Sequence, residues 1–184
     1  MIGTVMVVAV AAMIFPNDPA RYQPRNGAAH PLVIGTEQYG RYLNTALQIG
    51  LPIVLRDWVG LKQLAIVAAA STLATHGLKR GLNDVTVFGS RLGRRPHSDL
   101  SKHNTPSGHA SLAASGAWFV ARRYGMQYLW MLAPMTLLTM YARVMLNAHT
   151  VSATIAGALV GLLITALFTT RRPTPLPEQS AAAV

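Results

Sequence analysis

Apolar residues gather in six windows along the chain, which are separated by charged or proline-containing segments. The windows cover residues 1–15, 40–55, 61–78, 106–120, 126–146 and 150–170. A helix that crosses a bilayer needs about 20 mostly apolar residues, and somewhat fewer where the bilayer adapts. The pattern therefore predicts an all-α protein: a bundle of six transmembrane helices over residues 1–170, followed by a loose C-terminal tail over 171–184.

Three features inside these windows qualify the prediction. The first window is short enough to be a signal sequence, but it has no basic segment at its start, so we count it as a span. Arg41, Asn44 and Gln48 interrupt the second window, and they must face the bundle or an interface if that segment spans. His76 lies within the third window, where we expect a packed, hydrogen-bonded side chain.

Composition and charge support a membrane location and suggest an anionic partner. The chain is 51% hydrophobic and 12% charged, whereas about a quarter of the residues of a soluble domain are charged. The 16 Lys and Arg residues exceed the 6 Asp and Glu residues, which gives a net charge of +10. Such a surplus favours phosphate-bearing partners, and without a nucleic-acid motif the pattern favours lipid phosphate over nucleic acid. The absence of Cys excludes disulfides, thiolate zinc sites and thiol nucleophiles.

Two long polar segments, residues 16–39 and 79–105, connect the windows and are expected to carry function. Alternation of six spans places both segments on one face of the membrane. The opposite face has short connections and the tail, with Arg56, Lys62, Arg122, Arg123, Arg171 and Arg172. Cations in short connections are typical of the cytoplasmic side, although ten of the sixteen cations lie on the long-loop face. We therefore expect a multi-pass protein of the bacterial inner membrane whose active site faces the periplasm.

Three polar clusters fall on the long-loop face. The first is Lys79 and the basic run that ends at Arg95, the second is residues 106–109, and the third is Arg143 with His149. Guanidinium and ammonium groups bind phosphate oxygens, so these clusters predict a phosphate site. Two histidines within it suggest that one attacks phosphorus while the other protonates the leaving oxygen.

The second cluster predicts a helix start. Proline suits the first turn of a helix, so Pro106 is expected to open the fourth helix with Thr105 or Asn104 as its cap. The N–H groups of residues 107–109 would then be free to bind phosphate. We expect no metal and no other cofactor, because His97, Asp99 and His103 lie in a loop without a fixed helical spacing.

The segment Pro106-Ser107-Gly108-His109, together with Arg143 and His149 six positions later, resembles the type 2 phosphatidic acid phosphatase family. The resemblance implies a metal-independent lipid phosphatase built from six spans. It further implies that His149 is the nucleophile, which forms a phosphohistidine, and that His109 is the general acid. The phosphate ligands implied by the resemblance are Lys79, Arg95, Ser107, Gly108 and Arg143.

The chain departs from the family pattern in three places. Fifteen residues separate Lys79 from Arg95 where the family has six, which indicates an insertion and makes Arg91 a rival for the role of Arg95. Ala142 replaces a Ser, and Ala153 replaces the Asp that orients the nucleophilic histidine. Natural divergence and an introduced substitution both explain Ala153. Loss of such a carboxylate can cost about 10⁴ in rate, although Ser152, water or a backbone carbonyl could hold the ring instead.

The substrate is expected to be a membrane lipid phosphate, with lipid A favoured. The segment 79–102 carries six cations, more than one phosphate monoester needs, and the lengthened first block resembles the lipid A 1-phosphatase branch. Undecaprenyl diphosphate and phosphatidylglycerol phosphate are alternatives, as is phosphate transfer to another lipid. Ala153 also leaves open a catalytically silent lipid-phosphate binder, and the sequence does not determine an oligomeric state.

Overall fold

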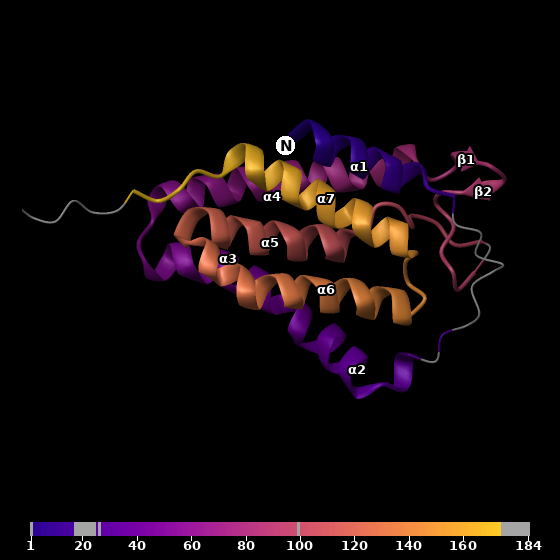
Figure 1. Cartoon of the computed structure of the whole chain (residues 1–184), viewed down its shortest axis with the longest axis horizontal. Coiled ribbons are helices and arrows are strands. Elements are labelled where there is room, and N and C mark those ends of the chain that lie inside the picture. The colour runs from indigo at the N-terminus through magenta and orange to yellow at the C-terminus, as the bar shows by residue number, and fades with distance from the viewer. Residues whose placement is uncertain (1, 17–24, 26, 99, 174–184) are drawn as a thin grey trace, which may run out of the picture.

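The protein is a bundle of helices that lie side by side, with a small β-hairpin at one end (Figure 1). The structure is a computed structural model, and it describes residues 2–16, 25, 27–98 and 100–173. The α-helices are α1 (Ile2–Ile14), α2 (Pro31–Gln38), α3 (Leu43–Val54), α4 (Trp58–Gly81), α5 (Gly108–Tyr124), α6 (Leu129–Met145) and α7 (Val151–Phe168). Short 3-10 helices cover Gly27–Ala29, Gly40–Tyr42 and Met126–Tyr128, and β1 (Thr86–Val87) pairs antiparallel with β2 (Ser90–Arg91).

The helical class predicted from the apolar pattern is confirmed, and each apolar window contains a helix. The two long polar segments also contain elements that the pattern did not predict, namely α2 in the first and the β-hairpin in the second. Among the described helices, α4 and α7 are long and apolar enough to cross a membrane, and α1 is a shorter apolar helix. A bundle of six spans therefore stays a prediction, and most of the predicted tail, residues 174–184, lies outside the described residues.

Glycines allow α5 and α7 to pack with their backbones in contact. A Cβ atom on Gly157 would overlap the carbonyl oxygen of Ser107, and one on Gly161 would overlap that of Ser111. Small residues at such spacing let two helices approach closely in a membrane. This contact holds the first turns of α5 and α7 against each other, so that residues at the two helix starts share one site.

The polar residues of α3 face the interior, as the cost of exposing them to lipid requires. Asn44 is fully buried, and its Nδ2 donates to the carbonyls of Ala113 at 2.9 Å and Leu132 at 3.1 Å. Gln48 is also buried and lies 3.5 Å from the hydroxyl of Ser115. These bonds tie α3 to α5 and α6. By contrast, the prediction that His76 is packed is wrong: its side chain is exposed on α4, next to a groove described below.

A buried ion pair closes the end of the bundle opposite the hairpin. Arg123 is 2% exposed, and its guanidinium donates to both carboxylate oxygens of Asp57 at 2.5 Å. Asp57 also caps α4 by accepting from the N–H of Gly60 at 2.9 Å. Arg122 donates to the carbonyl of Thr169 at 2.5 Å. Arg122 and Arg123, which the sequence predicts on the cytoplasmic side, therefore both bind protein groups at the ends of helices.

Asp57→Asn is expected to lower the free energy of unfolding by about 3–5 kcal/mol, because it leaves Arg123 buried without a countercharge. Asp84→Asn is the control: Asp84 is 82% exposed and lies 3.7 Å from Arg91, so its loss should cost less than about 1 kcal/mol. Unfolding in detergent micelles measures both. Similar losses in the two variants would contradict a buried pair.

The same pair should make stability depend on pH. Hydrogen bonds from Arg123 lower the pKa of Asp57 to about 2, below the value of about 3.8 expected in the unfolded chain. A lowered pKa means that the carboxylate stabilises the fold fully above about pH 4 and less as the pH falls towards 2. In Asp57→Asn this part of the acid dependence should disappear.

Candidate active site

The predicted site residues meet at the end of the bundle that carries the hairpin, on the right of Figure 1. The end of α4, the start of α5, the end of α6 and the start of α7 all reach this end. They carry Lys79, Ser107 to His109, Arg143 and His149, respectively. Helix direction thus brings residues from distant parts of the chain to one face, as the alternation of spans predicted.

His149 is buried, with 2% of its surface exposed, and its Nδ1 lies 2.8 Å from the carbonyl oxygen of Asn104. Burial lowers the pKa of His149 well below its ordinary value, and the nearby charges of Lys79, Arg143 and Arg95 lower it further. The ring is therefore neutral. Because a carbonyl only accepts hydrogen bonds, Nδ1 carries the proton and Nε2 has a free lone pair. Nε2 is thus the atom that can attack.

Asn104 is held in place by hydrogen bonds to Thr150, Gly93 and Thr105. Its side-chain oxygen accepts from the N–H of Thr150 at 3.1 Å, and its Nδ2 donates to the hydroxyl of Thr150 at 3.1 Å. Its own N–H donates to the carbonyl of Gly93 at 3.0 Å. Thr150 caps α7 through a bond from the N–H of Ala153. The carbonyl that faces His149 is therefore fixed to the start of α7.

Ala153, where the resemblance implies an orienting Asp, is fully buried. Its carbonyl accepts from the N–H of Ser107 at 2.8 Å, so this turn of α7 is packed against the start of α5. Of the substitutes considered for the missing carboxylate, the structure places a backbone carbonyl, that of Asn104, on Nδ1. The ring of His149 thus has a hydrogen-bond acceptor without a carboxylate at position 153.

The predicted start of the fourth helix is wrong by two residues. α5 begins at Gly108, and Ser107 is its cap, with an extended backbone and a hydroxyl that accepts from the N–H of Ala110 at 3.5 Å. Asn104 cannot serve as the cap because its side chain binds Thr150. The N–H of Ser107 is also used, by Ala153. The first-turn N–H groups of Gly108 and His109, and the proton of the Ser107 hydroxyl, are the donors left for a ligand.

Positive charge accumulates around the two histidines without an equal negative charge. The Nζ of Lys79 would lie 3.8 Å from a Cβ on Gly108, so the ammonium group sits at the start of α5. Burial and the charge of Arg143 lower the pKa of Arg95. Among the described residues, no carboxylate lies within 4.0 Å of Lys79 or Arg95.

Unsatisfied donors at the same place also indicate an anionic ligand. The buried Nε atoms of Arg95 and Arg143 have no hydrogen-bond partner among the described residues. Arg91, the rival of Arg95, lies in the hairpin, where it donates to the carbonyl of Ser101 at 2.7 Å and faces Asp84. Three cations with spare donors beside His149 make an arrangement that can bind an anion such as a phosphate group.

Two residues of this cluster were not predicted from the sequence. Glu37 of α2 accepts from Arg143 at 2.7 Å and from Arg41 at 2.5 Å. The same nitrogen of Arg41 lies 3.1 Å from Nε2 of His109. The four-residue spacing of Glu37 and Arg41 was the available signal, but Glu37 fell in a segment expected to be a loop and Arg41 at the start of the second predicted span. Among the described residues, no group of three or more His, Asp or Glu side chains could hold a metal ion.

The PAP2 superfamily matches residues 60–175, which include all of the predicted site residues. The chain belongs to the PAP2 superfamily. It is 44% identical over 135 residues to the lipid A 1-phosphatase of Helicobacter pylori strain J99, a match that covers 73% of this chain and 69% of that protein. The lipid A 4'-phosphatase of the same strain is 31% identical over 157 residues, which cover 83% of this chain and 77% of the relative.

A solved structure supports the PAP2 fold. It is the transmembrane PAP2-type phosphatidylglycerolphosphate phosphatase of Bacillus subtilis, which aligns with a TM-score of 0.53 and 20% identity over 90% of this chain and 83% of that one. Family and relatives together make this chain a phosphatase of membrane lipids, and therefore a membrane protein.

Proposed function

We propose that this PAP2 protein removes a phosphate from lipid A through a phosphohistidine formed on His149. The observation that carries the mechanism is the position of His149, whose Nδ1 faces the Asn104 carbonyl and whose ring lies near the charges of Lys79, Arg95 and Arg143. The substrate is proposed from the 44% identity to a lipid A 1-phosphatase. Lipid A is an acylated and phosphorylated disaccharide, so its phosphate and its sugar offer separate groups for recognition.

The first chemical step follows from the positions of these groups. Lys79, Arg95 and Arg143 bind the phosphate oxygens, with Ser107 and the first-turn N–H groups of α5 as further donors. Nε2 of His149 attacks phosphorus, and the bond from phosphorus to the leaving oxygen breaks. His109 gives its proton to that oxygen, which leaves as the lipid hydroxyl.

The second step reverses the role of His109. Now neutral, it takes a proton from a water molecule, whose oxygen attacks phosphorus and releases His149 and inorganic phosphate. Nε2 of His109 lies 3.1 Å from a guanidinium nitrogen of Arg41. Binding of a phosphate dianion favours the protonated ring that the first step requires.

The placement in the membrane is part of the proposal. We infer that α1 and α3 to α7 lie within the inner membrane of a bacterium and that the site faces the periplasm. The apolar surfaces of α1, α4 and α7 support the first part, and the short connections at the opposite end support the second.

Phosphate release from purified protein tests the function. We expect the highest kcat/KM on lipid A when it is compared with undecaprenyl diphosphate and phosphatidylglycerol phosphate. A preference for either of these lipids would reassign the substrate. If a folded protein that still binds lipid A released phosphate from none of these lipids, the result would favour a catalytically silent lipid-phosphate binder.

The orientation of His149 is tested by a pair of substitutions. Because Asn104 already supplies an acceptor for Nδ1, Ala153→Asp alone should change kcat/KM by less than about tenfold. Asn104→Ala frees the loop from Thr150 and should lower kcat/KM by about tenfold or more. Adding Ala153→Asp to Asn104→Ala should then restore activity. A rise of several orders of magnitude from Ala153→Asp alone would contradict the role of the Asn104 carbonyl.

A further inference from the structure

A groove of about 370 Å³ leads from the phosphate site along α4 into the membrane-spanning part of the bundle. At its outer end lie Lys79 and His109, which belong to the proposed active site. Its deeper wall carries side chains with hydroxyl, amide or imidazole groups: Gln48, Ser71, Thr72, Thr75, His76 and Ser111. Residues 71 to 79 cover about 12 Å of helix, so the polar side chains are spread over that length below Lys79.

Several of these polar groups have hydrogen-bonding capacity to spare. The hydroxyl of Ser71 is buried and has no partner among the described residues. Thr72 and His76 are exposed on the groove face of α4, one turn apart. Thr75 is different, because it donates to the hydroxyl of Ser111 at 3.2 Å. Polar groups on a helix that crosses a membrane are costly unless they meet a polar partner.

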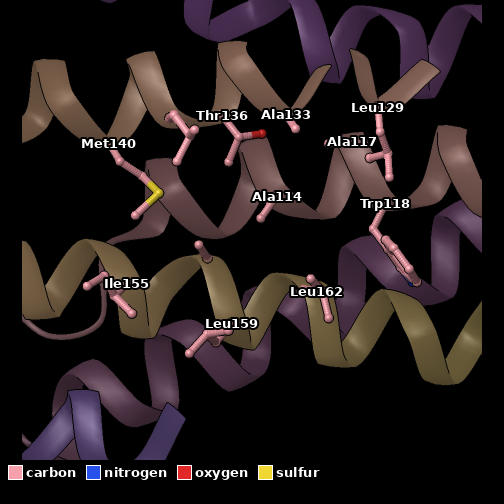
Figure 2. A pocket seen from close by; sticks show the side chains of 12 residues that line it. Ala114, Ala117, Trp118, Leu129, Ala133, Thr136, Met140, Ile155, Leu159 and Leu162 are labelled. Atoms are coloured by element: carbon pink, nitrogen blue, oxygen red, sulfur yellow. The ribbon is translucent and has the colours of Figure 1, made fainter. Parts of the chain in front are cut away.

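A second groove, which has an almost entirely apolar lining, provides a comparison. It measures about 340 Å³ and lies between α5, α6 and α7 (Figure 2). Leu159, Leu162, Met140 and Trp118 line it, and no residue of the phosphate cluster does. Its one hydroxyl, on Thr136, already donates to backbone carbonyls. The two grooves are similar in volume, but the α4 groove carries several polar side chains on a largely apolar wall and also opens to Lys79 and His109.

We propose that the α4 groove binds the hydroxyl- and amide-bearing sugar portion of the substrate, directly below the phosphate. This inference rests on the proposed function and deepens it. Ser71, Thr72 and His76 would then form hydrogen bonds with sugar hydroxyls and with the amide and ester groups that join the acyl chains. A phosphate carried by a plain alkyl chain offers none of these groups. The groove would therefore distinguish a glycolipid phosphate from the phosphate of a plain alkyl chain.

The test compares two substrates in two variants. The double variant Ser71→Ala with Thr72→Val keeps the shape of the groove while removing two hydroxyls. It should lower kcat/KM for lipid A by about tenfold, and change kcat/KM or Ki for dodecyl phosphate by less than about twofold. Thr4→Val is the matched control, because Thr4 is exposed on α1 and does not line the groove. It should affect neither substrate.

Each outcome separates the two proposals. A selective loss on lipid A supports the groove, and thermal unfolding in detergent verifies that the double variant is folded. Equal losses on both substrates, or no loss on either, would contradict sugar binding in the α4 groove, while the proposed phosphatase activity would still stand. If the unaltered protein released no phosphate from lipid A, the proposed function would be wrong. The sugar site, which rests on that function, would then be wrong as well.

Discussion

His149→Ala is expected to lower kcat by about 10⁴ or more and to abolish an acid-labile phosphoenzyme. The reason is specific to this side chain. Its Nδ1 faces the Asn104 carbonyl, so its Nε2 is unprotonated, and its burial keeps the ring neutral among three cations. Rapid quenching of the enzyme with lipid A carrying labelled phosphate would measure both quantities.

Two other histidines provide the comparison. His109→Ala should slow the dephosphorylation of lipid A strongly. It should slow the hydrolysis of p-nitrophenyl phosphate much less, because p-nitrophenolate leaves without being protonated. His97→Ala should remain within about twofold of the unaltered enzyme, since His97 is exposed and its Nδ1 faces the carbonyl of Asn147. Labelled phosphoenzyme in His149→Ala would refute its role as the nucleophile.

Arg143→Ala and Arg95→Ala should each lower kcat/KM by about 10² or more. Each guanidinium has a buried Nε without a protein partner among the described residues, which leaves it free to bind a phosphate oxygen. Arg91→Ala should have a much smaller effect, because Arg91 binds Ser101 and faces Asp84 in the hairpin. Steady-state kinetics on lipid A would rank the three.

A charge-preserving variant separates phosphate binding from general electrostatics. Arg143→Lys keeps the positive charge but loses the planar pair of donors, so its loss should lie between that of Arg143→Ala and the unaltered enzyme. If Arg91→Ala proved the most damaging and Arg95→Ala mild, Arg91 would be the phosphate ligand. The insertion between Lys79 and Arg95 would then have to be placed differently.

Features set by local side-chain pattern could be predicted from the sequence. Apolar runs produced the helices, because backbone polar groups in a membrane must be bonded within the helix. The inward position of Asn44 and Gln48 followed from the cost of exposing amides to lipid. The meeting of Lys79, His109 and Arg143 at one end followed from the alternating direction of successive helices. Their chemical roles are proposals that rest on this arrangement.

Contacts made by backbone atoms and by residues outside the apolar windows required the tertiary structure. The acceptor for His149 is a main-chain carbonyl 45 residues away, and a carbonyl is present in every residue, so no side-chain pattern marks it. Glu37 reaches Arg143 only because α2 forms in a segment that looked like a loop. Ser107, the cap of α5, lies against α7. Gly157 leaves room for the Ser107 carbonyl, and the Ser107 N–H donates to the carbonyl of Ala153. Sequence periodicity fixes which face of a helix is apolar, but close packing and the path of the loops decide which atoms of distant segments meet.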